Sequence, residues 1–157
     1  LILVAITNFH HLSVHKFLVM KKNLLLIAAF LSPILLHAGT IPDLVQKAFD
    51  EKFPGAKDIK WDKENAHEYE ASFIYHEIAC SANFSENGEW LETETTTSYE
   101  MLPLAVKQAF EKAHQGALIK TAAKIETAKG TTKFEVEYRQ HIKTIEALYN
   151  ADGTPVK

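Results

Sequence analysis

Residues 41–57 read IPDLVQKAFDEKFPGAK and residues 102–118 read LPLAVKQAFEKAHQGAL, so the chain carries one helical pattern twice. Each copy has a proline suited to a first helical turn, then apolar residues at helical spacing, then a glycine beyond the last of them. The segments that follow also match, from Glu70 with Glu135 to Gly88 with Gly153. Such an internal repeat is the first guide to architecture.

Between the two helical patterns, the spacing of apolar residues changes to two. Tyr69, Ala71 and Phe73 alternate with more polar neighbours, as in a strand buried on one face. Asn87-Gly88 and Asp152-Gly153 favour tight hairpin turns, the first of them a two-residue type I′ turn. The predicted fold class is therefore α+β: a tandem repeat of one helix plus a four-strand antiparallel meander, with the helices on one face of a curved antiparallel sheet.

The repeat also predicts how the chain is divided. Residues 40–98 are expected to form the first repeat and residues 99–157 the second, together making one compact domain. A four-strand sheet with one helix buries only one of its faces. The opposite face is expected to be open to solvent or to a partner, which antiparallel sheets tolerate.

The N-terminal residues have the features of an export signal. Met20-Lys21-Lys22 is a short basic stretch, Asn23–Leu36 is an apolar run broken by Pro33, and small residues follow up to Gly39. This order predicts a signal peptide over residues 20–39, from Met20 to about Gly39, because the apolar run is shorter than the ~20 residues of a membrane span. Residues 1–19 precede a good start methionine and are interpreted as mis-annotated upstream sequence.

Composition narrows the compartment and the partners. Removing the signal peptide and the residues before it leaves 14 of the 17 basic residues against an unchanged 20 acidic ones, a formal charge of −6. An acidic chain without basic clusters disfavours nucleic acid and anionic lipid as partners. Cys80 is the only cysteine, so no intrachain disulfide can form. Export without disulfides predicts a periplasmic or secreted bacterial protein, with no stable membrane span after signal cleavage.

A set of residues, mostly in the first repeat, resembles a known family. They are Pro42, Ala48-Phe49, Phe53-Pro54-Gly55-Ala56, Trp61, Tyr69-Glu70-Ala71, Phe84, Gly88-Glu89-Trp90 and Glu92-Thr93-Glu94. With them the chain resembles the PepSY-like proteins of the β-lactamase-inhibitor-like group, small exported proteins of Bacteroidetes-type bacteria. The resemblance covers nearly all of residues 40–157 and is weaker in the second repeat. It implies a tandem α+β repeat that binds other proteins rather than catalysing a reaction, and it transfers no functional residue.

Carboxylates fall mostly on strand positions opposite the predicted apolar face. The candidate binding residues among them are Glu70, Glu92, Glu94, Glu135 and Glu137. Together they could form an acidic surface for a basic protein segment or for calcium. The alternative interpretation is that they only keep an exposed sheet soluble. Paired carboxylates for glycoside hydrolysis would need a cleft, which an open sheet does not supply.

Four further residues complete the candidate binding set. His76 and His141 occupy equivalent outward positions, and Arg139 shares the outward side with Glu135 and Glu137. Zinc would need more ligands than the two histidines, so no metal site is predicted. Trp90 would anchor a partner if it pointed to the open face, but its neighbour Leu91 competes for the buried side.

The sequence thus predicts an exported binding protein rather than an enzyme. It would present an open sheet face to a protein or peptide, and a specific form of this role is an inhibitor or modulator of a cell-envelope hydrolase. The alternative is a periplasmic module that senses a cation or small ligand with the acidic face. No catalytic residue and no cofactor is predicted, and the oligomeric state is left open.

Overall fold

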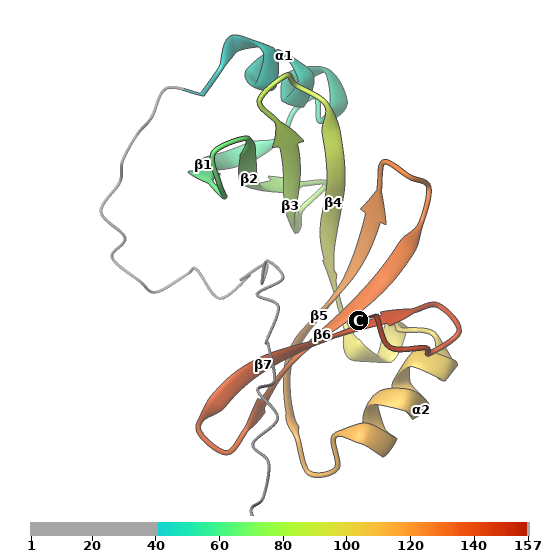
Figure 1. The fold of residues 1–157 in the computed structure, drawn as a ribbon. Helices are drawn as coiled ribbons and strands as arrows, with labels where there is room; N and C mark the ends of the chain where they lie inside the picture. Colours follow the sequence, from blue (N-terminus) through green and yellow to red (C-terminus); the bar gives the residue numbers. More distant parts are fainter. Residues whose placement is uncertain (1–40, 157) are drawn as a thin grey trace, which may run out of the picture. The chain divides into compact units, whose positions relative to one another are not determined.

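The computed structural model describes residues 41–156. The predicted signal peptide and the segment before it lie outside this range. The described elements follow the chain in the order α1 (Asp43–Lys52), β1 (Lys57–Lys63), β2 (Glu68–Tyr75), β3 (Ile78–Ser85), β4 (Trp90–Thr97), the 3-10 helix η1 (Tyr99–Met101), α2 (Leu104–Ala113), β5 (Leu118–Thr127), β6 (Thr132–Gln140) and β7 (Lys143–Asn150) (Figure 1).

All seven strands form one antiparallel sheet in chain order, β1 to β7. The two halves of the chain are joined by β4 and β5, which pair from Glu92 with Thr127 to Thr97 with Ala122. The intervening helix α2 therefore does not divide the sheet (Figure 1).

The predicted tandem repeat of one helix plus a four-strand meander is wrong. Over residues 41–156 the structure is a single seven-strand sheet with two α-helices, and the second half of this range contributes three strands. After β7, the chain turns back along it without forming a further strand: Asn150 N donates to Thr154 O at 2.9 Å, Val156 N donates to Leu148 O at 2.8 Å, and Tyr149 and Pro155 form an isolated bridge. Pro155 has no N–H to donate to a strand ladder, which is one physical reason why no eighth strand forms here.

Helix α1 forms where the sequence places its apolar spacing. Pro42 caps it with a φ of −60°, and Asp43 in the first turn and Lys52 in the last turn both complement the helix dipole. Val45 and Phe49 point into the sheet and are fully buried. The helix ends at Phe53, whose N–H donates to Phe49 O at 2.8 Å.

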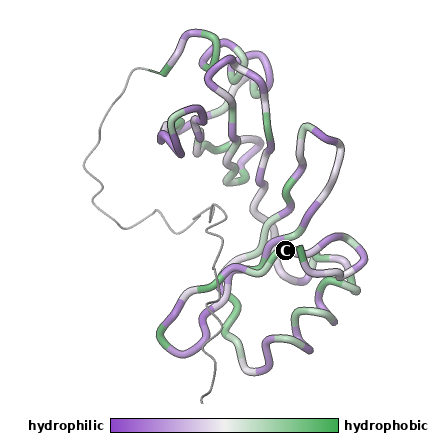
Figure 2. The backbone as a smooth tube through the Cα atoms, viewed as in Figure 1, coloured by the Kyte–Doolittle hydropathy of each residue, from purple (hydrophilic) through white to green (hydrophobic). Residues whose placement is uncertain are grey.

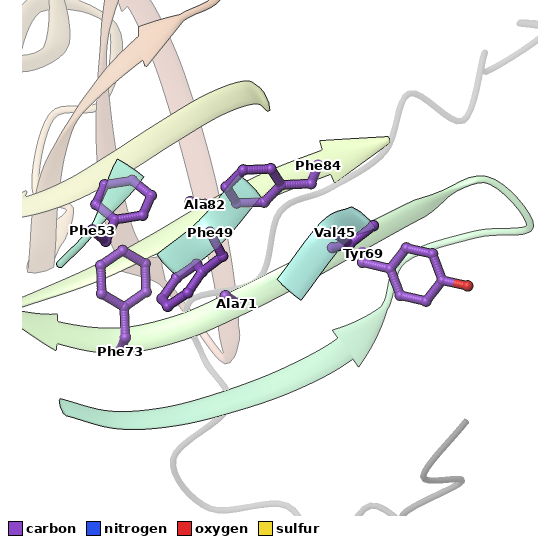
Figure 3. Packing of buried hydrophobic residues seen from close by; sticks show 8 residues of the cluster. All are labelled: Val45, Phe49, Phe53, Tyr69, Ala71, Phe73, Ala82 and Phe84. Atoms are coloured by element: carbon purple, nitrogen blue, oxygen red, sulfur yellow. The ribbon is translucent and has the colours of Figure 1, made fainter. Parts of the chain in front are cut away.

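The core beneath α1 is largely aromatic. The Phe49 ring lies 4.9 Å from the Phe73 ring and 5.3 Å from the Trp61 ring, both edge to face. Figure 3 shows Phe49, Phe53 and Phe73 packed together, with the Tyr69 hydroxyl pointing away from them. Such edge-to-face pairs add to the free energy gained by burying the rings.

Phe49→Ala is expected to lower the free energy of unfolding by about 4 kcal/mol, because it removes a fully buried ring and leaves a cavity. Leu44→Ala on the same helix is the matched control, since Leu44 is 60% exposed and should change stability by no more than about 0.5 kcal/mol. Urea unfolding followed by circular dichroism measures both. Equal losses for the two variants would contradict the assignment of this core.

Helix α2 covers a second cluster on β5 to β7. Its buried residues Val106 and Phe110 pack with Val136 and Tyr138 of β6. The Tyr138 hydroxyl and His114 Nδ1 form a hydrogen bond of 2.8 Å, and burial raises the pKa of Tyr138. Figure 2 shows that both helices carry hydrophilic as well as hydrophobic residues, as expected for helices with one buried side.

Both helices cover the same face of the sheet. Ala82, which packs under α1, is the register partner of Thr93, and Thr93 is the partner of Glu126 on β5. Lys124 and Ala122 follow Glu126 at intervals of two residues, so all three lie on the same side of β5. Ala122 packs under α2. Among the described residues, neither helix lies over the opposite face, which we call the open face.

Candidate functional site

The open face gathers acidic and amide side chains from five strands. Successive side chains of a strand point to opposite faces of the sheet. By the strand register, these side chains share the face opposite Ala71, Ala82 and Val136. They are Glu70 on β2, Asn83 on β3, Glu92 and Glu94 on β4, Glu135 and Glu137 on β6, and Glu146 on β7.

Glu94 lies at the centre of this face and is almost fully buried. It is only 2% exposed, between Ser81 on β3 and Ile125 on β5. Neither of its carboxyl oxygens has a hydrogen-bond partner. Burial, followed by the charges of Glu135 and Glu70, raises the pKa of Glu94 to about 9. At neutral pH this side chain is therefore a neutral acid.

The neighbouring carboxylates show the same effect. Glu135 is 2% exposed, and burial followed by the charge of Glu146 raises its pKa to about 8. Burial also raises the pKa of Glu70 and of Glu146 to about 7, and that of Glu92 above its ordinary value. The charge of Glu146 on β7 also contributes to the raised pKa of Glu94.

Asn83 supplies a second unpartnered acceptor. Its side chain is 6% exposed and Oδ1 has no hydrogen-bond partner. It lies between Glu70 on β2 and Glu92 on β4. Asn83 is not among the residues predicted from the sequence to bind, although the apolar alternation of Cys80, Ala82 and Phe84 places it opposite the core.

The predicted site residues are only partly brought together. Glu70, Glu92, Glu94, Glu135, Glu137 and Arg139 share the open face, with Arg139 exposed near the end of β6. His76 and His141 lie in hairpin turns rather than on strands, with φ values of 50° and 56°. Both are exposed, so neither joins the acidic cluster.

Trp90 lies on the helix side of the sheet. It pairs with Phe84 of the core, and its Nε1 donates to Thr93 Oγ1 at 2.9 Å. The ammonium of Lys52 sits 3.6 Å from the centre of its ring. The two residues line a cavity of about 590 Å³ between the end of α1 and the β5–β6 hairpin. Sequence spacing gives no indication of this cavity, since its walls lie far apart in the chain.

Residues 41–156 contain neither a metal-binding cluster nor a helix that could span a membrane. No group of three or more His, Cys, Asp and Glu side chains there is arranged to hold a metal ion. Neither described helix has the length and apolar character that a membrane span requires.

Solved structures share this fold. A protein of Bacteroides eggerthii described as a putative periplasmic protein superposes with a TM-score of 0.68 at 20% identity, over 76% of this chain and 88% of that chain. A DUF2874 family protein of Bacteroides ovatus gives 0.65 at 22% identity, over 76% and 86%. A BLIP-like protein of Bacteroides fragilis gives 0.63 at 25% identity, over 76% and 86%.

The described residues, one antiparallel sheet with two α-helices, thus have the same fold class as these Bacteroides proteins. Within it, the chain belongs to the family described as "Putative beta-lactamase-inhibitor-like, PepSY-like", whose pattern matches residues 67–154. The resemblance inferred from the sequence is therefore confirmed. The family is inhibitor-like, and the match indicates no enzyme family. No curated protein matches the chain.

Proposed function

We propose that this protein is an exported, non-catalytic binding protein that presents its open face to a protein or peptide partner, in the periplasm or outside the cell. The observation that carries the proposal is the buried, unpartnered carboxyl group of Glu94 on a face that neither described helix covers. Buried polar groups are nearly always hydrogen-bonded in native proteins.

The free-energy cost of burying Glu94 supports a binding role. Burying a carboxyl group without a partner costs free energy that the isolated domain does not recover. Natural proteins depart from such rules at functional sites and offset the cost elsewhere. Replacement of Glu94 by an apolar residue would remove the cost, so its presence favours an occupant that supplies the missing hydrogen bonds.

A more specific form of the proposal is a modulator of a cell-envelope hydrolase. It is supported by the family description, which is inhibitor-like, and by the neighbour described as BLIP-like. Periplasmic or secreted location is supported by the neighbour described as periplasmic and by the sequence features of residues 20–39.

Site-specific photo-crosslinking tests which face binds. A benzophenone side chain is placed at Thr96, on the open face of β4, in the exported protein. The matched control carries the same group at Lys47, on the exposed side of α1. Irradiation in a cell-envelope extract should give an adduct of defined mass from position 96 only.

The outcomes separate the possibilities. The partner in the adduct is identified by mass spectrometry and, if it is a hydrolase, its turnover is measured with and without this protein. Equal adducts from positions 96 and 47, or adducts from position 47 alone, would overturn the open-face proposal. A partner that is not a hydrolase would remove the modulator role and leave the binding role.

Cation sensing is the second candidate, because the unpartnered oxygens of Glu94 and Asn83 could also accept a cation. Calorimetry of the protein with calcium chloride and with zinc chloride tests it. The main proposal expects no saturable heat from either ion, whereas a saturable heat lost in Glu94→Gln would support the sensing role.

A further inference from the structure

We propose that the partner contributes an arginine to the open face, with the guanidinium group donating hydrogen bonds to the carboxyl oxygens of Glu94 and the side-chain oxygen of Asn83. This inference rests on the proposed function and names the chemistry of the partner. The occupant is thus an arginine-bearing segment of a protein or peptide.

The unpartnered atoms on this face call for a donor. They are both oxygens of Glu94 and Oδ1 of Asn83, which are fully buried, so neighbouring side chains must move for a donor to reach them. Carboxylate and amide oxygens accept hydrogen bonds, whereas a guanidinium has five N–H donors and no acceptor. A carboxylate can also receive two parallel N–H bonds from one guanidinium, which fits a side chain with two free oxygens.

The charge of the face favours a cation. Its carboxyl groups belong to Glu70, Glu92, Glu94, Glu135, Glu137 and Glu146, and Asp62 and Glu68 lie toward its β1–β2 side. The basic residues on the same face are Lys57, Lys60, Lys133 and Arg139, and Lys57 forms an ion pair with Glu77. The charge of Lys133 lowers the pKa of Glu92 and so opposes the effect of burial, and Arg139 is exposed near the end of β6. None of the ion pairs found among the described residues includes Glu94 or Glu135.

Without a bound cation, the buried carboxyl groups of this face are protonated. The pKa of Glu94 is raised to about 9 and that of Glu135 to about 8, so both carboxyl groups are protonated at neutral pH. A guanidinium beside them would stabilise their charged forms and lower both pKa values. Binding should therefore release protons, and affinity for a cation should rise with pH through the range from 7 to 9.

A guanidinium fits better than the other cations. Among the described residues, no group of three or more His, Cys, Asp and Glu side chains is placed so that it could hold a metal ion. A lysine ammonium is a strongly hydrated point charge, whereas arginine is more weakly hydrated and holds its donors in a planar fork. A buried site with paired acceptors on neighbouring strands suits the fork.

A capped peptide, acetyl-Thr-Arg-Thr-Arg-Thr-amide, is the probe, with citrulline in place of both arginines as the matched neutral control. Calorimetry at pH 6.5 and at pH 8.5 measures affinity, and two buffers of different ionisation enthalpy measure proton release. The arginine peptide should bind at least about tenfold more tightly than the citrulline peptide, and about tenfold more tightly at the higher pH. Binding of both peptides with equal affinity would overturn the inference.

Substitutions on and away from the open face test where the arginine peptide binds. Glu94→Gln with Glu135→Gln should weaken the arginine peptide at least about tenfold and abolish proton release. Glu51→Gln, on the exposed side of α1, removes one charge of the same sign and should change nothing. Circular dichroism confirms that each variant is folded. An equal loss in both variants would indicate general attraction to an acidic protein, which contradicts a defined site.

Competition by the peptides in the crosslinking experiment separates this inference from the proposed function. The arginine peptide, and not its citrulline form, should compete with adduct formation at position 96. If an adduct specific to position 96 forms and neither peptide competes, the binding role stands and the arginine inference is wrong. If no such adduct forms, the binding role fails.

Discussion

Gly88→Ala is expected to lower the free energy of unfolding by about 3 kcal/mol, because the added methyl group has no room against α1. A Cβ built at Gly88 lies 2.6 Å from the backbone oxygen of Leu44. The φ of Gly88 is also +80°, a conformation that residues with a side chain adopt only at a cost. Urea unfolding followed by circular dichroism measures the loss.

Gly130→Ala separates the two causes. Gly130 has a similar φ of +74°, but a Cβ there meets no atom within 4 Å. This variant should lose only the cost of the backbone conformation, about 1 kcal/mol. Gly153→Ala should behave like Gly88→Ala, since its Cβ would lie 2.5 Å from the oxygen of Ala105 in α2. If Gly88→Ala and Gly130→Ala lose the same stability, the contact with α1 contributes nothing.

The hairpin at Gly88 shows what sequence can and cannot predict. Asn87-Gly88 correctly marks a turn between two strands, but the predicted two-residue type I′ form is wrong. Ser85 N donates to Glu89 O at 2.9 Å, so the loop has three residues, and Gly88 alone among them has a positive φ. The dipeptide carries no information about Leu44, which lies far earlier in the chain.

Local spacing predicts the two helices and their buried sides well. Val45, Phe49, Val106 and Phe110 repeat at helical intervals, and each is buried against the sheet. Strand pairing is different, because it joins residues that are distant in sequence. Nothing local indicates that Thr93 would pair with Glu126, which is the contact that makes one sheet of the chain.

Alternation predicts the side of a carboxylate but not its burial. Glu94 and Glu135 lie on the side of the sheet that the pattern indicates, yet each is only 2% exposed. Their burial depends on the side chains of neighbouring strands, such as Ser81 and Ile125 beside Glu94 and Ala123 and Leu148 beside Glu135, which the pattern of one strand does not encode. Trp90 was ambiguous for a related reason: the irregular pairing after Asn83 aligns it with Phe84 on the helix side.

Glu94→Gln is expected to stabilise the protein increasingly as pH rises, by about 5 kcal/mol at pH 8 and by nearly nothing at pH 4. The fold raises the pKa of Glu94 from 4.5 to about 9. Below pH 4.5 the carboxyl group is protonated in both the folded and the unfolded chain, so the stability of the protonated form is fully present. Between pH 4.5 and pH 9 the unfolded chain releases the proton and the folded chain keeps it.

Stability should therefore fall as pH rises through this window, by up to about 1.4 kcal/mol per pH unit for each such group. Glutamine carries no proton to release, so the variant loses this part of the dependence and keeps the part due to Glu135, whose pKa is about 8. Urea unfolding of the native protein and the variant at pH 4, 6 and 8 measures the difference at each pH.

The control is Glu51→Gln, whose side chain is exposed and should give no difference that grows with pH. A constant difference between Glu94→Gln and the native protein at all three values would mean that Glu94 is not held as a buried acid. If the difference grows as expected while the same substitution weakens the arginine peptide, one carboxyl group both lowers stability and supports binding. That opposition is what a site retained for function, at a cost to the free fold, requires.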